Sequence, residues 1–241
     1  MINIVSVAHR CRLLGALFAP LVLVACATTS NVQQIDRLKV IDADPRVLLM
    51  PPDVRYYLLT AGGVSEPHAE WTMAAQTNID AAIRDLASDM GTDLVVLNDD
   101  DLTPDEMRYR SLHSAVGQTV LTNHFGSLKL PSKNRQFDWS LGSGIQSLAA
   151  DKEGDYALFV FYRDEQASGG RIAFAVLAAA AGGYASVGAE YGFASLVDLE
   201  TGDIVWFNVV TAGSGEMRDP EGAATAVRTL FRDIPTNRTV E

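Results

Sequence analysis

Seven consecutive apolar and aromatic residues, Tyr156–Tyr162 (YALFVFY), constrain the fold more than any other segment of the chain. A strand with one face in water alternates apolar and polar side chains, whereas an unbroken apolar run is typical of a strand covered on both faces. The run therefore predicts a central strand. A sheet with helices on its faces is the α/β class of fold.

Residues 46–50 and 54–59 predict two further strands, separated by Pro51-Pro52-Asp53, and 93–97 (DLVVL) predicts a buried one. A long helix is predicted between them, with Ser65 as its cap and Pro67 in its first turn. Its apolar residues recur every three or four positions, and a strand, helix and strand in this order usually make a parallel pair. They are Trp71, Ala75, Ile79, Ala82, Ile83, Leu86 and Met90.

A second helix is predicted from Thr103, because threonine followed by Pro104 and then Glu106 forms a capping box. Residues 166–170 predict a loop. A hairpin is predicted from 191–199 and 204–211, with Val205, Phe207 and Val209 on one face and Ile204, Trp206 and Val210 on the other. A last helix is predicted after Asp219. We therefore expect one globular α/β domain over residues 45–235: a single small mixed sheet with a parallel core, a C-terminal hairpin and helices packed on it.

The N-terminus has the features of a secretory signal: two basic residues, Arg10 and Arg12, no acidic residue, and an apolar stretch over residues 13–25. Thirteen helical residues span about 20 Å, too short for a permanent membrane anchor. The stretch ends in Leu-Val-Ala-Cys, which resembles the lipobox of bacterial lipoproteins. The resemblance implies cleavage after residue 25 and lipidation of Cys26, and Ala27 points to the outer membrane. Cys11 leaves with the signal, so Cys26 is the one thiol of the mature chain.

Residues 26–44 are then the lipidated cysteine and a flexible polar tether, and 236–241 a tail. Losing Arg10 and Arg12 takes the formal charge from −11 to −13. An acidic chain is unsuited to nucleic acid and is repelled by anionic headgroups. We therefore expect the acyl chains, and no basic patch, to hold the protein at the periplasmic face of the outer membrane.

Eighteen uncharged residues, 172–189, follow Arg171. They allow a transmembrane helix, but alanine and glycine dominate and the residues that drive insertion are few. The favoured interpretation is a small-residue helix or hairpin packed within the fold or between subunits. Ala178–Gly188 is accordingly the best candidate for a packing or oligomer surface.

Other patterns give weaker candidate sites. His68, His113 and His124 lie in no metal-binding motif, so a zinc site would need distant partners such as the acidic Asp99–Asp101 cluster. The Ser168–Arg171 segment could hold an anion with its amides and guanidinium. We find no catalytic serine or cysteine constellation and no nucleotide-binding loop, and expect no cofactor.

The hairpin and strand order resemble the CsgG/TolB-N-terminal-like periplasmic lipoproteins. In that group a D-x-x-T-G-x-x-x-W hairpin closes the sheet, here carried by Asp198, Thr201, Gly202 and Trp206. The resemblance implies scaffolding, assembly or partner activation without chemistry. The chain lacks the alternating amphipathic pairs of the pore-forming members.

The leading hypothesis is therefore an outer-membrane lipoprotein that acts as a non-catalytic interaction or assembly factor of an envelope complex. An envelope protein is its expected partner, and a second copy of the chain, in a homo-oligomer, is the alternative partner. The first alternative is an envelope enzyme, a metal-assisted hydrolase using the histidines. The second is a sensor that binds a small anionic or cell-wall ligand at the Arg171 loop.

Overall fold

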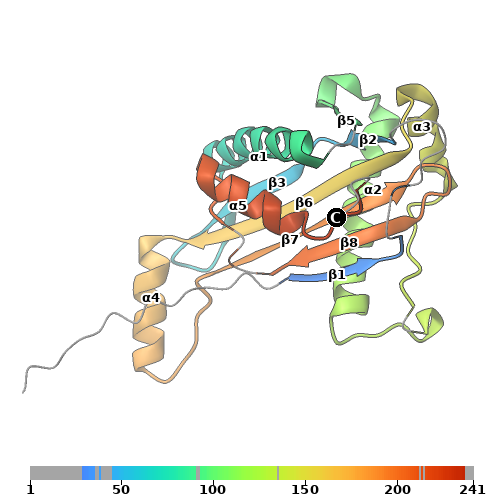
Figure 1. Cartoon of the computed structure of the whole chain (residues 1–241). Coiled ribbons are helices and arrows are strands. Elements are labelled where there is room, and N and C mark those ends of the chain that lie inside the picture. Colours follow the sequence, from blue (N-terminus) through green and yellow to red (C-terminus); the bar gives the residue numbers. More distant parts are fainter. Residues whose placement is uncertain are drawn as a thin grey trace, which may run out of the picture.

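The computed structural model describes residues 29–35, 38, 45–90, 93–134, 136–211, 213 and 215–236. The predicted signal peptide, Cys11, Cys26 and residues 237–241 lie outside them. The described chain forms a mixed sheet of eight strands with helices on both faces, which confirms the predicted α/β class (Figure 1).

The elements alternate along the chain as a mixed α/β fold requires. The strands are β1 (Thr29–Gln33), β2 (Arg46–Leu49), β3 (Asp53–Leu59), β4 (Ser65–Pro67), β5 (Asp93–Val96), β6 (Tyr156–Ala167), β7 (Gly188–Asp198) and β8 (Ile204–Val210). The α-helices are α1 (Ala69–Met90), α2 (Pro104–Val120), α3 (Gln146–Lys152), α4 (Gly169–Ala180) and α5 (Pro220–Leu230), joined by short turns η1 (Asp99–Asp101), η2 (Leu121–Phe125), η3 (Pro131–Lys133) and η4 (Ser143–Ile145).

Strand β6 is the centre of the sheet, as its unbroken apolar run predicts. The strand order is β1-β8-β7-β6-β2-β5, and β3 also pairs with β6. The first half of β6 pairs in parallel with β2 and its second half with β3, because the Pro51-Pro52 break lets the chain continue along the same neighbour. On the other side β6 pairs antiparallel with β7 along its whole length.

Two apolar cores cover the two faces of the sheet. Tyr156, Leu158 and Val160 of β6 point into the core that α1 and α5 cover, whereas Ala157 and Phe159 point into the core beneath α2 and α3. Alternate residues of one strand thus enter opposite cores, and the strand is apolar throughout for that reason.

Local signals in the sequence explain the helices around this sheet. Thr103 caps α2 by accepting a hydrogen bond from the Glu106 amide at 3.3 Å, and the Glu106 carboxylate accepts one from the Thr103 amide at 2.6 Å. Parallel pairing of β2 with β5 confirms the strand–helix–strand unit. The predicted start of α1 is wrong by a few residues, because Ser65–Pro67 pairs with β3 as strand β4 and the helix begins at Ala69.

The C-terminal hairpin of β7 and β8 is confirmed, with one correction to its faces. A register shift next to Leu196 and Val197 makes an irregular pair opposite Ile204 and Val205. A bulge of this kind reverses side-chain alternation. Val205 therefore joins Trp206 in the α1/α5 core, and Ile204 points into the opposite core.

Two further predictions give the wrong secondary structure for their segments. Thr29–Gln33, assigned to the tether, forms the edge strand β1 beside β8. The predicted loop at 166–170 is the end of β6 followed by the first turn of α4, since Ser168 caps the helix by accepting from the Arg171 amide at 3.2 Å.

Candidate functional site

Five strands bring their ends together at one end of the sheet. β3 and β6 end there together at Leu59 and Ala167, and β7 begins opposite them. Val210, at the end of β8, lies opposite both Gly192 of β7 and Thr29 of β1. The first described residues of the chain therefore enter at this end, and α4 projects beyond it (Figure 1).

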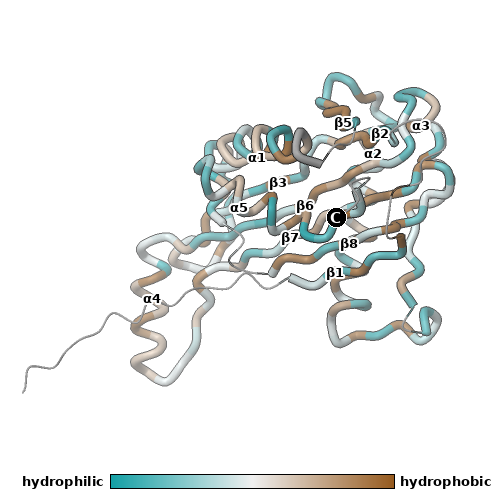
Figure 2. Tube along the Cα trace, in the orientation of Figure 1, coloured by the Kyte–Doolittle hydropathy of each residue, from teal (hydrophilic) through white to brown (hydrophobic). Residues whose placement is uncertain are grey.

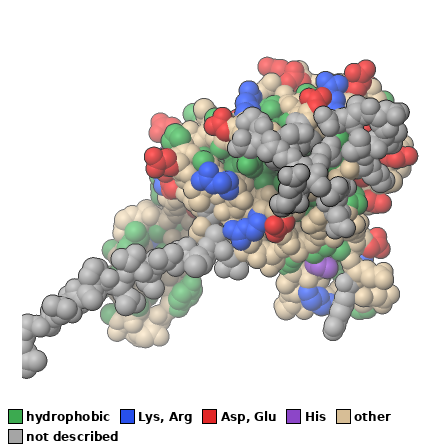
Figure 3. Space-filling model, viewed as in Figure 1, with side chains coloured by type: hydrophobic (Ala, Val, Ile, Leu, Met, Phe, Trp, Pro, Cys, Tyr) green, Lys and Arg blue, Asp and Glu red, His purple; other side chains and the backbone are tan. Residues whose placement is uncertain are grey.

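Residues 168–187, here called the α4 lobe, expose their apolar side chains. None of the residues of α4 is buried. Leu177 is 69% exposed and Tyr184, in the returning loop, 90%. Figure 2 shows most of the lobe as apolar to neutral. In Figure 3 the visible part of the lobe carries hydrophobic side chains among backbone and other atoms, whereas acidic side chains are spread over the body of the domain. Six of the eleven large apolar side chains that the described residues expose belong to it: Ile172, Phe174, Val176, Leu177, Tyr184 and Val187.

Short contacts hold the base of the lobe to the domain. Arg171 donates from Nε to the Ser186 carbonyl at 2.8 Å, which ties the helix to the returning chain. A Cβ at Gly170 would lie 3.1 Å from that of Ala61, so the base of α4 packs closely on the turn after β3. The lobe is thus fixed at its root and uncovered beyond it.

Three carboxylates gather at the root of this lobe, on β6, on β7 and just before α5. Tyr162 donates its hydroxyl to Glu190 at 2.8 Å. Arg218 holds Glu216 with two hydrogen bonds, from Nε at 2.8 Å and from Nη2 at 2.5 Å. Asp164, 8% exposed, completes the group.

Gln166 and Tyr56 connect these carboxylates. The Gln166 amide donates to Glu216 at 3.0 Å and to Asp164 at 3.2 Å. The Tyr56 hydroxyl donates to Glu216 at 3.3 Å and accepts from the Met217 amide. We call Asp164, Glu190 and Glu216 with these partners the carboxylate cluster.

The surroundings of Asp164 and Glu216 shift the pKa values of these two carboxyl groups in opposite directions. Burial, with the nearby charges of Glu190 and Glu216, raises the pKa of Asp164 to about 6. The hydrogen bonds from Arg218 lower the pKa of Glu216 to about 2. Neighbouring carboxyl groups whose pKa values differ this much mark candidate functional sites. An open hollow of about 580 Å³ lies between Asp164 and the lobe.

Nothing in the sequence pointed to this cluster, because its members lie 26 residues apart and their pairing depends on the register of β6 with β7. The one available signal was the polar ending of an otherwise apolar strand, at Asp164 and Gln166.

A second polar cavity, of about 480 Å³, lies between η2 and the segment after η3. Two of the four lysines of the chain, Lys129 and Lys133, line it with His124 and Trp139. Lys133 lies 4.7 Å from the Trp139 ring centre, and the indole Nε1 is buried without a hydrogen-bond partner among the described residues. Lys129 donates to the His124 carbonyl and Lys133 to the Asp138 carbonyl, and the Asp138 carboxylate lies 3.6 Å from Lys133. Each ammonium group has further N–H donors that could take an anion.

The structure does not bring the three histidines together. His68 stacks on Trp71 at 3.8 Å, His113 is buried against Phe159 at 4.7 Å, and His124 packs edge-on to Phe125. Burial lowers the pKa of His113 to about 3, so it is neutral in the fold. Within the described ranges no group of three or more His, Cys, Asp or Glu residues is placed to hold a metal.

The Asp99–Asp101 cluster forms turn η1, where Asp99 pairs with Arg110 at 2.8 Å and Asp101 accepts from the Asn98 amide. The metal-assisted hydrolase alternative thereby loses its suggested zinc ligands, the three histidines with the Asp99–Asp101 cluster. Arg171 lies in the first turn of α4, where a loop site was predicted, and its Nε is taken by Ser186.

The hairpin motif builds the turn of the sheet. Asp198 accepts from the amides of Glu200 and Thr201 at 2.8 and 3.2 Å, and the Thr201 hydroxyl accepts from the Asp203 amide. Gly202 has φ +82°, and a Cβ there would lie 2.3 Å from the Gly142 carbonyl oxygen. Trp206 is fully buried in the core under α1 and α5.

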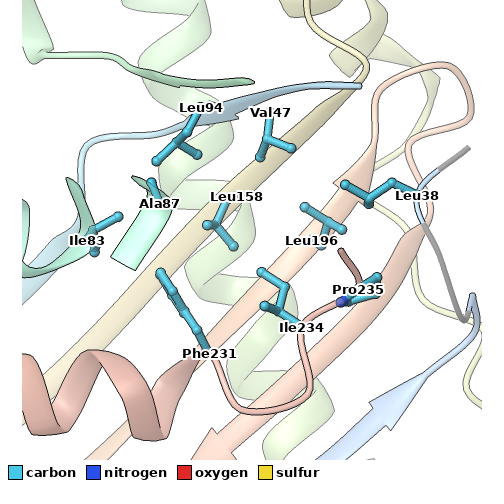
Figure 4. Close-up of a pocket in the computed structure, with 10 residues that line it drawn as sticks. All are labelled: Leu38, Val47, Ile83, Ala87, Leu94, Leu158, Leu196, Phe231, Ile234 and Pro235. Atoms are coloured by element: carbon cyan, nitrogen blue, oxygen red, sulfur yellow. The ribbon is translucent and has the colours of Figure 1, made fainter. Parts of the chain in front are cut away.

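The enclosed apolar pocket under α1 and α5 is a packing gap. Its volume is about 10 Å³, about enough for one water. Figure 4 shows apolar side chains from the sheet, α1 and the segment after α5 converging on it, including Leu158, Leu196 and Phe231.

No helix in the described part of the chain has both the length and the hydropathy to span a membrane. α4 has 12 residues, about 18 Å at 1.5 Å each, so the transmembrane interpretation of 172–189 is wrong. Packing within the fold is also wrong for α4, because none of its side chains is buried.

No protein-family model and no curated protein matches the chain. Membership of the CsgG/TolB-like group therefore stays a prediction. Among solved structures, the PelC dodecamer of Paraburkholderia phytofirmans is similar at 9% identity and a TM-score of 0.40, over 88% of this chain and all of that one. A single-residue variant of the same dodecamer gives 10% identity and 0.39, over the same shares. Likenesses at this level carry no argument about this chain.

Proposed function

We propose that the chain is an outer-membrane lipoprotein, anchored through Cys26 on the periplasmic face, that works as a non-catalytic interaction or assembly factor of an envelope complex. The observation that carries the proposal is the α4 lobe. Exposed apolar surface on this scale marks an interaction site. The lobe stands at the sheet end where β1 begins, three residues after Cys26.

Two other observations support binding as the mode of action. The family resemblance implies that the hairpin motif shapes the sheet. Its side chains make hydrogen bonds within the turn or lie in the core, as Asp198 and Trp206 do. The carboxylate cluster is tied up in hydrogen bonds with Arg218, Gln166 and Tyr162. The hairpin motif thus shapes the end of the sheet opposite the lobe, and the cluster holds the root of the lobe.

The anchor is tested by the intact mass of the protein purified from its native membrane. We expect a first residue of Cys26 carrying acyl chains, and a Cys26→Ser variant that lacks this mass. An unmodified N-terminus, or one that begins elsewhere, contradicts the anchor.

The interaction role is tested by crosslinking in cells followed by mass spectrometry. A carboxyl-reactive crosslinker suits this chain, which has 30 acidic residues and few lysines. We expect an envelope protein to be recovered with the wild type and lost with Cys26→Ser, the matched control. Recovery of no protein contradicts the role.

A second candidate function, sensing of a small anionic ligand, is favoured by the basic cavity at Lys129 and Lys133 and no longer by Arg171. Two ammonium groups can pair with one carboxylate or phosphate. Titration with inorganic phosphate or glucuronate, monitored by the intrinsic fluorescence of the three tryptophans, should saturate in the wild type and not in Lys129→Gln. Equal responses of the two proteins contradict this candidate.

A further inference from the structure

We propose that the α4 lobe lies in the lipid bilayer surface, as a second membrane contact beside the acyl anchor. The inference rests on the proposed anchor at Cys26, and it names the partner of the lobe as lipid. The lobe needs a cover, its position favours a membrane, and its construction suits one.

The lobe needs a cover because α4 is apolar on all its sides. Only Arg171, Ala175 and Ala178 are partly covered, and they lie on one narrow face at positions i, i+4 and i+7. Ile172, Phe174 and Leu177 on the other sides are exposed by half or more. A helix that is hydrophobic all round is normally buried. Within the described chain nothing covers these sides.

Its position favours lipid over a second copy of the chain. Cys26 precedes Thr29 by three residues, which span at most about 10 Å. Thr29 lies opposite Val210, and Val210 opposite Gly192, four residues into the strand that leaves the lobe. Acyl chains on Cys26 therefore bring this end of the sheet to the bilayer. The net charge of −13 opposes contact with a second copy and with anionic headgroups alike, and the lobe itself has no charge beyond Arg171, so the position of the anchor decides for lipid.

The construction of the lobe suits the boundary between headgroups and acyl chains. Three of the last four carbonyls of α4, those of Leu177, Ala178 and Ala179, accept from the amides of Ala181, Gly182 and Gly183. A helix closed in this way leaves few backbone groups that need water. Tyr184 stands 90% exposed in the returning loop, and tyrosine is enriched at membrane interfaces. At 12 residues the helix lies in one leaflet and does not cross.

The test places one fluorescent NBD label on the full-length, natively lipidated protein reconstituted into phosphatidylethanolamine/phosphatidylglycerol vesicles. Leu177→Cys puts the label on the lobe, and Ala150→Cys, exposed on α3 at the opposite end of β6, is the control. Both side chains are exposed, so both variants fold. An acylated Cys26 does not react with the label.

We expect the label at position 177 to emit at shorter wavelength and to lose most of its fluorescence when shallow doxyl lipids are included. The label at position 150 should show neither change. Equal behaviour of the two labels overturns the inference. So does a label at position 177 that is shielded but insensitive to doxyl lipids and forms disulfides between copies when left unlabelled, because a second copy then covers the lobe.

The intact mass of the same samples separates the two proposals. Acyl mass on Cys26 with a water-exposed label at 177 keeps the proposed function and overturns the lipid contact. If the acyl mass is absent, the proposed function fails. The label at 177 is then read on a chain in which Cys11 and Cys26 are replaced by serine, so that no other thiol takes up label, after vesicles are added. Quenching supports the lobe as a lipid contact, and its absence overturns it.

Discussion

Replacing Asp164 with asparagine should stabilise the protein at neutral pH and do little in acid. Asp164 has a pKa of about 6 in the fold against an ordinary value of 3.8, because burial and the charges of Glu190 and Glu216 disfavour its ionised form. A raised pKa on an acid means that the folded state binds the proton more tightly. Stability therefore falls as the pH rises from 3.8 through 6, and the loss is complete above that range.

The size of the effect follows from the shift. Each pKa unit corresponds to 1.36 kcal/mol, so the shift limits the penalty at pH 7.5 to about 3 kcal/mol. Asparagine resembles the protonated acid in shape, and its carbonyl still accepts from Gln166. We expect Asp164→Asn to raise the free energy of unfolding at pH 7.5 by about 1–3 kcal/mol, or several degrees in Tm for a domain of this size.

The assay is urea unfolding of wild type and variant between pH 3.5 and 8, taken as a difference so that the other titrating groups cancel. The difference should be near zero below pH 4 and grow to a plateau above pH 6. Glu216→Gln is the opposite-sign control: its lowered pKa stabilises the fold above pH 4.5 and this is lost as the pH falls toward 2. A pH-independent difference, or a less stable Asp164→Asn at pH 7.5, refutes the reasoning.

Three further predictions concern unfolding free energies measured by denaturant titration. Gly142 and Gly202 both have φ +82°, but only at Gly202 would a Cβ meet backbone, so Gly142→Ala should cost about 1–2 kcal/mol and Gly202→Ala clearly more; equal costs contradict the contact. Gly117→Ala gains helix propensity but places a methyl 2.0 Å from the Phe193 ring, so a net loss of about 1–3 kcal/mol is expected, and a gain contradicts the packing. Leu177→Ser should change stability by less than about 0.5 kcal/mol, because that side chain contributes no core contact; a larger loss contradicts its exposure.

The sequence predicted most of the sheet, because its strands are long and apolar or bounded by strong turn signals. β6 is central for the reason its run of apolar residues indicates, and the capping box of α2 forms as its spacing predicts. β1 was missed because an edge strand with one partner and little burial needs no apolar pattern, and Thr29–Gln33 has none. β1 pairs with β8 because the outer edge of β8 presents backbone N–H and C=O groups that need a partner strand.

The site features escaped prediction for a different reason. Ser168-Gly169-Gly170 reads as a loop because glycine disfavours helices, yet serine is a good cap and the chain turns directly into α4. The carboxylate cluster depends on tertiary register alone, since Asp164 and Glu190 face each other across β6 and β7.

The carboxylate cluster and the α4 lobe are structurally connected. β6 continues between β3 and β7 to the end of the sheet, whereas the first residues of β7, before Gly192, pair with β6 alone. Asp164 and Glu190 face each other there, and the α4 lobe joins the two strands. The start of β7 is thus an edge with backbone pairing on one side, so side-chain hydrogen bonds such as that from Tyr162 to Glu190 help to hold it. The cluster is therefore best explained as the brace that fixes the lobe, and Tyr162→Phe should loosen α4 before it weakens the core. Hydrogen exchange tests this: faster exchange confined to 164–192 supports the brace, whereas unchanged protection there contradicts it.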